Sequence, residues 1–192
     1  AEEMGLIESL GALMLRRACA LAAERRAAGR HLGVTINVSG RQLERGSLVA
    51  TLRAVLAETG ARPGDVTLEL TESVAMRNPD RVLRTLDEIA ALGVGLAIDD
   101  FGTGYSSLAY LHRFPVDVLK IDRSFVEGLA DDAQARTLAR TIVGVARSLG
   151  LRTVAEGIET EAQRVILLEL GCEMGQGWLF GRPVGAELLA AP

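Results

Sequence analysis

The stretch PDRVLRTLDEIAALGVGLAIDD, residues 79–100, contains one complete structural unit of this chain. Apolar residues recur at helical spacing over Pro79–Leu92, Gly93 is a typical helix terminator, and Val94–Ile98 is a short, uniformly apolar run. Such runs without polar alternation are typical of buried parallel strands. The stretch therefore predicts a helix and then a buried strand, with two aspartates directly after the strand.

The same unit repeats along the rest of the chain, and a glycine again ends most helices just before the next strand. Strands separated by helices, with no hairpin dipeptide between them, predict parallel βα units. The predicted helices are Leu6–Ala28, Leu43–Glu58, Pro79–Leu92, Ala133–Leu149 and Glu161–Leu170. The predicted strands are Val34–Val38, Val66–Leu70, Val94–Ile98, Val116–Ile121, Thr153–Ala155 and Gly177–Phe180.

Six such units fit either a doubly wound sheet or a (β/α)8 barrel. A barrel usually takes about 250 residues, whereas this chain has 192 and opens on a helix. We therefore expect an α/β fold with a single domain over residues 1–192, a TIM-like (β/α)8 barrel whose first two strands are missing from this chain. Because the first residue is Ala1 rather than methionine, we expect the chain to come from a longer protein.

The bulk composition excludes several classes of protein. Hydrophobic residues make up 48% and charged residues 24%, which is an ordinary globular balance. The net charge of −4 and the lack of a long basic run argue against a protein that binds duplex nucleic acid, but not against a small nucleotide. Two cysteines, Cys19 and Cys172, do not make a disulfide framework, so we expect reduced thiols and a cytoplasmic location, with any membrane tether outside this chain.

Polar side chains gather at one end of every predicted strand, the carboxyl end at which barrel active sites are built. They are Asn37, Glu69, Glu72, Asp99, Asp100, Lys120, Asp122, Glu156 and Glu159, with Gln176 before the last predicted strand. Singly, most have ordinary explanations, since an aspartate after a strand is more often a helix cap than a ligand. Glu69 is the exception, because a carboxylate inside an apolar strand is costly unless it is paired or metal-bound. Six coincident strand ends favour one shared site.

The residue types indicate the chemistry of that site. Carboxylate and amide oxygens suit Mg²⁺ or Mn²⁺. The adjacent Asp99 and Asp100 can serve two metal ions, and two ions can clamp the attacking and leaving oxygens of a phosphodiester displacement. Lys120 can neutralise phosphate charge or help to position the attacking water. The two histidines, His31 and His112, form no zinc pattern.

A glycine- and serine-rich loop, Phe101–Leu108, follows the two aspartates. A loop of this kind that opens a helix can cradle phosphate through its backbone N–H groups. Many loops contain glycine and serine, so the pattern by itself is weak.

Together these segments resemble the EAL family of cyclic-di-GMP phosphodiesterases. The matching segments are Asn37-Val38-Ser39, Glu69–Ser73, Asp99–Leu108, Lys120-Ile121-Asp122, Ala155–Thr160 and Gln176-Gly177. Their order and spacing agree along essentially the whole chain, which makes the match highly specific. The Glu-Ala-Leu motif that names the family would precede residue 1.

The resemblance implies hydrolysis of cyclic di-GMP to linear pGpG, in bacterial second-messenger signalling, by a two-metal site with Mg²⁺ or Mn²⁺. Asn37, Glu69 and Asp99 would hold the first metal, and Asp99 would bridge to a second metal that Asp100 binds. Glu156 would bind metal or metal-bound water.

The resemblance also assigns supporting roles. Lys120 would contact the attacking water and the phosphate. Glu72 would hold the loop, which in the family links dimerisation to metal binding. The other residues implied as substrate or support groups are Asp122, Glu159, Gln176, Gly102, Thr103, Gly104, Tyr105 and Ser106. A homodimer through this domain, and covalently linked sensor or cyclase domains, would follow.

Two other interpretations remain open. A catalytically inactive relative would sense cyclic di-GMP or bind protein partners, and an unrelated barrel enzyme would act on a phosphorylated metabolite. The upstream sequence discriminates the first of these, because an intact Glu-Ala-Leu favours catalysis. We expect the 192-residue chain alone to be inactive, since the family places a further metal-binding carboxylate in that motif.

Overall fold

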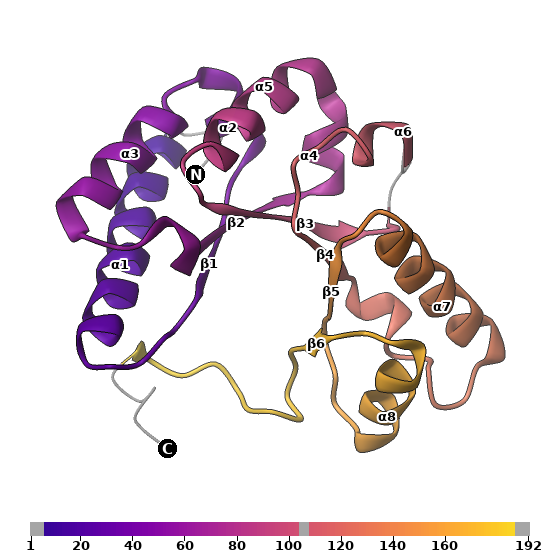
Figure 1. Ribbon diagram of the computed structural model, residues 1–192. Coiled ribbons are helices and arrows are strands. Elements are labelled where there is room, and N and C mark those ends of the chain that lie inside the picture. The colour runs from indigo at the N-terminus through magenta and orange to yellow at the C-terminus, as the bar shows by residue number, and fades with distance from the viewer. Residues whose placement is uncertain (1–5, 104–107, 187–192) are drawn as a thin grey trace. The chain divides into compact units, whose positions relative to one another are not determined.

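The computed structural model describes residues 6–103 and 108–186, in which strands and helices alternate (Figure 1). The helices are α1 Ile7–Ala27, α2 Gly40–Arg45, α3 Leu48–Thr59, α4 Glu72–Arg77, α5 Pro79–Ala90, α6 Leu108–Leu111, α7 Ala133–Ser148 and α8 Glu161–Leu170. The strands are β1 Val34–Asn37, β2 Val66–Thr71, β3 Gly95–Phe101, β4 Val118–Ile121, β5 Arg152–Ala155 and β6 Met174–Gly175. Two single 3₁₀ turns are η1 Pro63–Asp65 and η2 Arg123–Phe125.

The six strands form one sheet whose spatial order follows the chain, from β1 to β6. Strands β1 and β2, β4 and β5, and β5 and β6 pair in parallel. The predicted parallel βα architecture is therefore confirmed. The chain divides into two compact units, one made of residues 1–98 and 104–117 and the other of residues 99–103 and 118–192. Strand β3 contributes residues to both units.

The first unit is built around the packing of α1 against α3. Helix α1 buries Leu15 and Cys19, while α3 buries Leu52 and Val55, so each helix contributes one apolar stripe to a common core. The Arg26 guanidinium forms an ion pair with Asp65 in η1 and lowers the pKa of that carboxyl. This contact fastens the end of α1 to the segment that leads into β2.

The second unit is built around α7, which contacts β4, β5 and α8. Asp132 caps α7 by accepting a hydrogen bond from the backbone N–H of Gln134 at 2.7 Å. Thr160 and Gln163 form a capping box at the start of α8, and Gly171 ends α8 in the left-handed conformation. Local sequence signals therefore fix where both helices begin and where α8 ends.

The predicted helix Leu43–Glu58 was wrong in one respect, because the structure has two helices there. Helix α2 ends at Gly46, whose φ of 78° is left-handed, and α3 begins two residues later. Ser39 and Gln42 form a capping box that starts α2 before the apolar pattern begins. A continuous apolar periodicity concealed this break.

The predicted last strand Gly177–Phe180 was also wrong. The strand is β6, Met174–Gly175, so Gln176 follows the last strand instead of preceding it. The Trp178 and Phe180 residues are 52% and 58% exposed, so this apolar run lies in turns at the surface rather than inside a sheet. An exposed aromatic turn produced the same residue pattern as a buried strand.

Within the two described stretches of the chain, no helix combines the length and apolar character needed to cross a membrane.

We predict that Leu52→Ala lowers the free energy of unfolding by about 2–5 kcal/mol, the usual cost of emptying a fully buried leucine site. Leu52 is 0% exposed on α3. Urea denaturation followed by circular dichroism measures the change. Leu138→Ala is the control, because Leu138 is 44% exposed, and equal losses in the two variants would contradict the core assignment.

Candidate active site

Three carboxylates of the second unit converge at the carboxyl ends of two strands. Asp99 and Asp100 lie near the end of β3, and Glu156 directly follows β5. One oxygen from each carboxylate lies within 4.8 Å of the others. All three residues are partly buried. Carboxylates this close repel one another unless a cation lies among them.

The ammonium group of Lys120 is such a cation. Lys120 lies in β4, which is between β3 and β5 in the sheet. Its Nζ lies 3.0 Å from Asp99 Oδ1 and 2.5 Å from Glu156 Oε1, and its side chain is only 6% exposed. A buried ammonium group is stable only when it is paired. The cluster thus stabilises positive charge at its centre, and its all-oxygen donor set could hold a hard divalent cation as well.

Asp100 adopts a backbone conformation that few residues tolerate. Its φ is 54°, in the left-handed region, where aspartate is more often found than most other non-glycine residues. Its N–H donates to Asp99 Oδ1 at 3.0 Å, and its carbonyl accepts from Thr103 Oγ1 at 2.8 Å. Strained backbone of this kind clusters at functional sites. The turn that it forms begins the glycine-rich loop with Gly102 and Thr103.

Residues Gly104, Tyr105 and Ser106, which the sequence also placed in the site, lie outside the described residues.

The environment of Asp100 raises the pKa of its carboxyl above the ordinary value. Partial burial is the largest cause, and the negative charges of Asp99 and Asp122 add to it, while Lys120 acts in the opposite direction. The ionised form of Asp100 is therefore less favourable in the folded chain than in water. A divalent cation at the cluster would reverse this imbalance.

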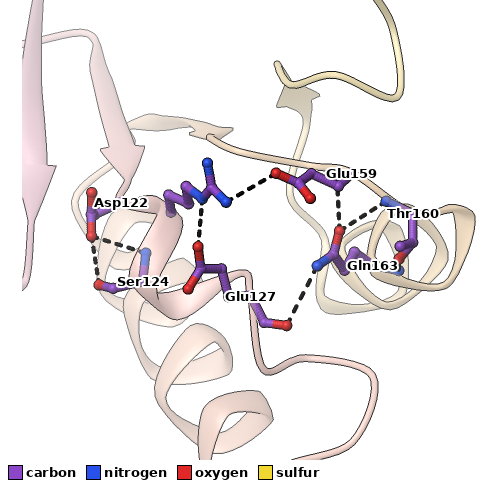
Figure 2. A network of polar contacts seen from close by, with 7 residues as sticks. Asp122, Ser124, Glu127, Glu159, Thr160 and Gln163 are labelled. Carbon is purple, nitrogen blue, oxygen red and sulfur yellow. Dashed lines mark hydrogen bonds and ion pairs between the residues drawn. The ribbon is translucent and has the colours of Figure 1, made fainter.

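Two neighbouring residues support the cluster in different ways. Gln176, directly after β6, donates from Nε2 to Glu156 Oε1 at 3.3 Å. Asp122 caps η2, accepting from the backbone N–H of Ser124 at 3.0 Å and from its hydroxyl at 2.5 Å (Figure 2). The structure thus brings Gln176 into contact with the cluster, whereas Asp122 acts on it through charge.

Glu159 contacts a different set of residues. Its carboxylate faces the Arg123 guanidinium at 3.0 Å, and its backbone N–H donates to Gln163 Oε1 at 2.8 Å (Figure 2). Arg123 and Gln163 were absent from the predicted site. The capping-box pattern Thr160-x-x-Gln163 is visible in the sequence and could have indicated Gln163.

The remaining predicted ligands belong to the first unit. Asn37, the last residue of β1, is the register partner of Glu69 in β2, so the two lie side by side on adjacent strands. Glu69 and Glu72 are 6% and 2% exposed. Buried carboxylates at the end of a parallel strand agree with the predicted placement, and their roles stay predictions.

We predict that Asp100→Asn raises the thermal stability of the metal-free protein at pH 7. A raised carboxyl pKa means that ionisation costs folding free energy above that pKa, and asparagine removes the charge while tolerating the same φ. The gain should be about 0.2–1 kcal/mol, because solvent screens a partly exposed charge. It should disappear below about pH 3.9, the ordinary aspartate value, where the carboxyl is protonated in both states.

Thermal unfolding in chelator at pH 7 and at pH 3 measures this effect. Asp131→Asn, a change at an exposed position, is the control. A loss of stability at pH 7, or a gain that persists at pH 3, would contradict the assigned electrostatics.

The sequence of the chain is similar to that of known proteins. The sequence profile of the EAL domain matches residues 1–183. The bifunctional diguanylate cyclase/cyclic di-GMP phosphodiesterase MucR of Pseudomonas aeruginosa is 44% identical over 192 residues, which cover 100% of this chain and 28% of that protein. Cyclic di-GMP phosphodiesterase PdeR of Escherichia coli is 38% identical, over 97% of this chain and 28% of its own length. The chain thus spans about a quarter of the length of these curated relatives.

Solved structures agree with the sequence comparison. The PaMucR phosphodiesterase in complex with cyclic di-GMP has a TM-score of 0.95 and 44% identity, covering 99% of this chain and 77% of that one. The EAL domain of Mycobacterium smegmatis DcpA has a TM-score of 0.89 and 40% identity, covering 95% and 83%. The α/β fold, with parallel strands of a TIM-like barrel, is that of these domains. By sequence and by fold, this chain belongs to the EAL domain family.

Proposed function

We propose that this domain hydrolyses cyclic di-GMP to linear pGpG, with two Mg²⁺ or Mn²⁺ ions held at the strand ends. The observation that carries the proposal is the convergence of Asp99, Asp100 and Glu156 around the ammonium group of Lys120. The identity of the substrate is supported by relatives that are named as cyclic-di-GMP phosphodiesterases and by a similar structure bound to that nucleotide.

The proposed metal ligands are side chains that offer oxygen donors. Asn37, Glu69 and Asp99 would hold one cation, and Asp99 would bridge to a second cation held by Asp100. Glu156 would bind a metal ion or its water. Such ions supply Lewis acidity and a nucleophilic water at neutral pH. The oxygen-only donor set favours Mg²⁺ or Mn²⁺ over softer metals.

Lys120 is the residue of this chain best placed to act on the reacting phosphate. Its ammonium group lies at the centre of the cluster, where it can donate to the attacking water and to a phosphate oxygen. In the reaction, the oxygen of water forms a new bond to phosphorus and the bond from phosphorus to one ribose 3′ oxygen breaks. The proton from water ends on that 3′ oxygen, which leaves a linear dinucleotide with a 5′ phosphate.

Supporting roles follow the same arrangement. Gln176 would orient Glu156, and Asp122 and Glu159 would hold the segments after β4 and β5. The glycine-rich loop that begins at Gly102 would contact the phosphate or a partner. Glu72 would anchor that loop, coupling metal binding to a homodimer through this domain. We also propose that residues 1–192 belong to one cytoplasmic domain, joined in the full protein to sensor or cyclase domains.

We predict that Asp99→Asn abolishes turnover by the full-length protein, because it removes a charge that both cations need with little change of volume. Chromatographic analysis of pGpG from cyclic di-GMP and Mg²⁺ measures this. Glu161→Gln is the matched control and should keep wild-type turnover, since Glu161 pairs with Arg164 within α8. Wild-type hydrolysis by Asp99→Asn, or in excess chelator, would refute the proposed metal site. Tight binding of cyclic di-GMP without any turnover by the wild type would instead identify a sensor.

We predict that Lys120→Met separates catalysis from metal binding. Turnover should fall on the order of 100–1000-fold, the usual cost of removing one preorganised group that stabilises developing charge. Mg²⁺ should bind at least as tightly as in the wild type, because the ammonium group no longer competes for Asp99 and Glu156. Titration calorimetry and product analysis measure the two effects. Loss of Mg²⁺ binding in this variant would show that Lys120 acts mainly by holding the cluster together.

A further inference from the structure

We propose that Arg123 is a positioning residue that fastens together the segments following β4, β5 and β6, and thereby sets the place of Glu156 in the cluster. The inference rests on the proposed function, since the cluster is the site that Arg123 would serve. Arg123 is the first residue of η2, three positions after Lys120 and next to Asp122. It belongs to the same unit as Asp99, Lys120 and Glu156.

The first contact of Arg123 is made by its aliphatic stem. Gly157 follows Glu156 and has a φ of 68°. A Cβ atom at Gly157 would collide with Cβ, Cγ and Cδ of Arg123. The stem therefore packs directly against the backbone beside Glu156, at a position where only glycine leaves room and tolerates the conformation.

The second set of contacts is made by the guanidinium group. Its Nε lies 2.5 Å from Glu127 Oε1, and its Nη2 lies 3.0 Å from Glu159 Oε1. Glu127 follows β4 and Glu159 follows β5, so the two labelled carboxylates belong to two different segments (Figure 2). Both carboxylates raise the pKa of Arg123. The positive charge thus bridges the two loops.

The third contact reaches the segment after β6. The guanidinium carbon of Arg123 lies 5.8 Å from the centre of the Trp178 ring, and that of Arg182 lies 4.6 Å from it. Both distances are within the range of a cation–π interaction. Trp178 follows Gln176, whose amide donates to Glu156. Arg123 therefore contacts Gly157, which follows Glu156 in the chain, and Trp178, which lies in the same segment as the Gln176 that donates to Glu156.

The side chain of Gln163 joins the segments after β4 and β5 independently of Arg123. The Gln163 Oε1 atom accepts from the backbone N–H groups of Glu159 and Thr160 at 2.8 and 2.9 Å, and its Nε2 donates to the Glu127 carbonyl at 3.5 Å (Figure 2). Gln163 is only 7% exposed. The segments after β4 and β5 are thus joined by one buried amide and one half-exposed guanidinium.

These contacts identify a positioning role rather than a large contribution to stability. Exposed ion pairs such as Arg123–Glu127 are individually weak. Their effect is geometric, because groups that orient a metal ligand typically change metal affinity or activity by about 10–100-fold when removed. The ion pairs of Arg123 are made with Glu127 and Glu159, and its stem packs against Gly157, so its influence on Glu156 would pass through Gly157 and Glu159.

The test compares three variants of the full-length protein. Arg123→Met keeps much of the stem and removes the charge, Arg123→Lys restores a charge that can meet one carboxylate, and Arg164→Met is the matched control. Arg164 pairs with Glu161 in the first turn of α8 and contacts no predicted site residue through that pair. Circular dichroism establishes that each variant is folded.

We expect Arg123→Met to weaken Mg²⁺ binding by about 10–100-fold in titration calorimetry. The Mg²⁺ concentration for half-maximal kcat should rise by the same factor, and saturating Mg²⁺ should largely restore kcat with little change in the KM for cyclic di-GMP. Amide hydrogen exchange over residues 156–160 should quicken. Arg123→Lys should recover part of each loss, and Arg164→Met should match the wild type.

Unchanged Mg²⁺ affinity together with unchanged exchange over residues 156–160 in Arg123→Met would overturn the inference. Equal effects in Arg164→Met would also overturn it, since they would indicate a general loss of stability. Calorimetry and hydrogen exchange do not require turnover. A protein that fails to hydrolyse cyclic di-GMP would therefore refute the proposed function while these two measurements still decide the role of Arg123.

Discussion

The ammonium group of Lys120 lies in a setting where an unpaired charge would be very costly. Its side chain is 6% exposed, and its Nζ contacts Asp99 at 3.0 Å and Glu156 at 2.5 Å. Each partner in turn depends on the cation, because carboxylates held this close repel one another. Asp99 lies in β3, Lys120 lies in β4 and Glu156 directly follows β5, so the ion triad exists only if the carboxyl ends of these strands lie in register. The charge balance of this one cluster therefore constrains how the strands that bear it pair.

The surrounding structure meets that constraint at several levels. The parallel pairing of β4 with β5 sets Ile121 opposite Ala155, which brings Asp122 and Glu156 to the same edge. Asp100, near the end of β3, has a left-handed backbone and donates its N–H to the Asp99 carboxylate. Capping groups and the contacts of Arg123 then hold the segments that follow β4 and β5. Local conformation, strand pairing and charge all favour the same arrangement, which is typical of a sequence that specifies one structure.

Much of this could be predicted from the sequence, because the signals are local. Uniformly apolar runs marked the strands, glycines marked most helix ends, and α8 begins and ends at the predicted residues. The sequence also indicated four residues of the site: Asp99, Asp100, Lys120 and Glu156. Ionisable groups beside buried strands are costly unless they are paired or bound to a metal. The predictions that were wrong have equally clear physical reasons. Gly46 interrupts an apolar periodicity that continues through it, and the exposed residues Trp178 and Phe180 imitate a strand. Arg123 makes its contacts across three separate segments, and no pattern within one segment records them.

The claim at the centre of this account is that water, with bound divalent cations, opens cyclic di-GMP at the cluster of Asp99, Asp100 and Glu156. The most direct measurement is mass spectrometry of the product after the full-length protein acts on cyclic di-GMP in ¹⁸O-labelled water, with Mg²⁺ and with chelator. The account predicts pGpG with one ¹⁸O atom, located in its 5′ phosphate, and no product in chelator. Product formed at the same rate in chelator, or no opening of the nucleotide with Mg²⁺ or Mn²⁺ present, would contradict it.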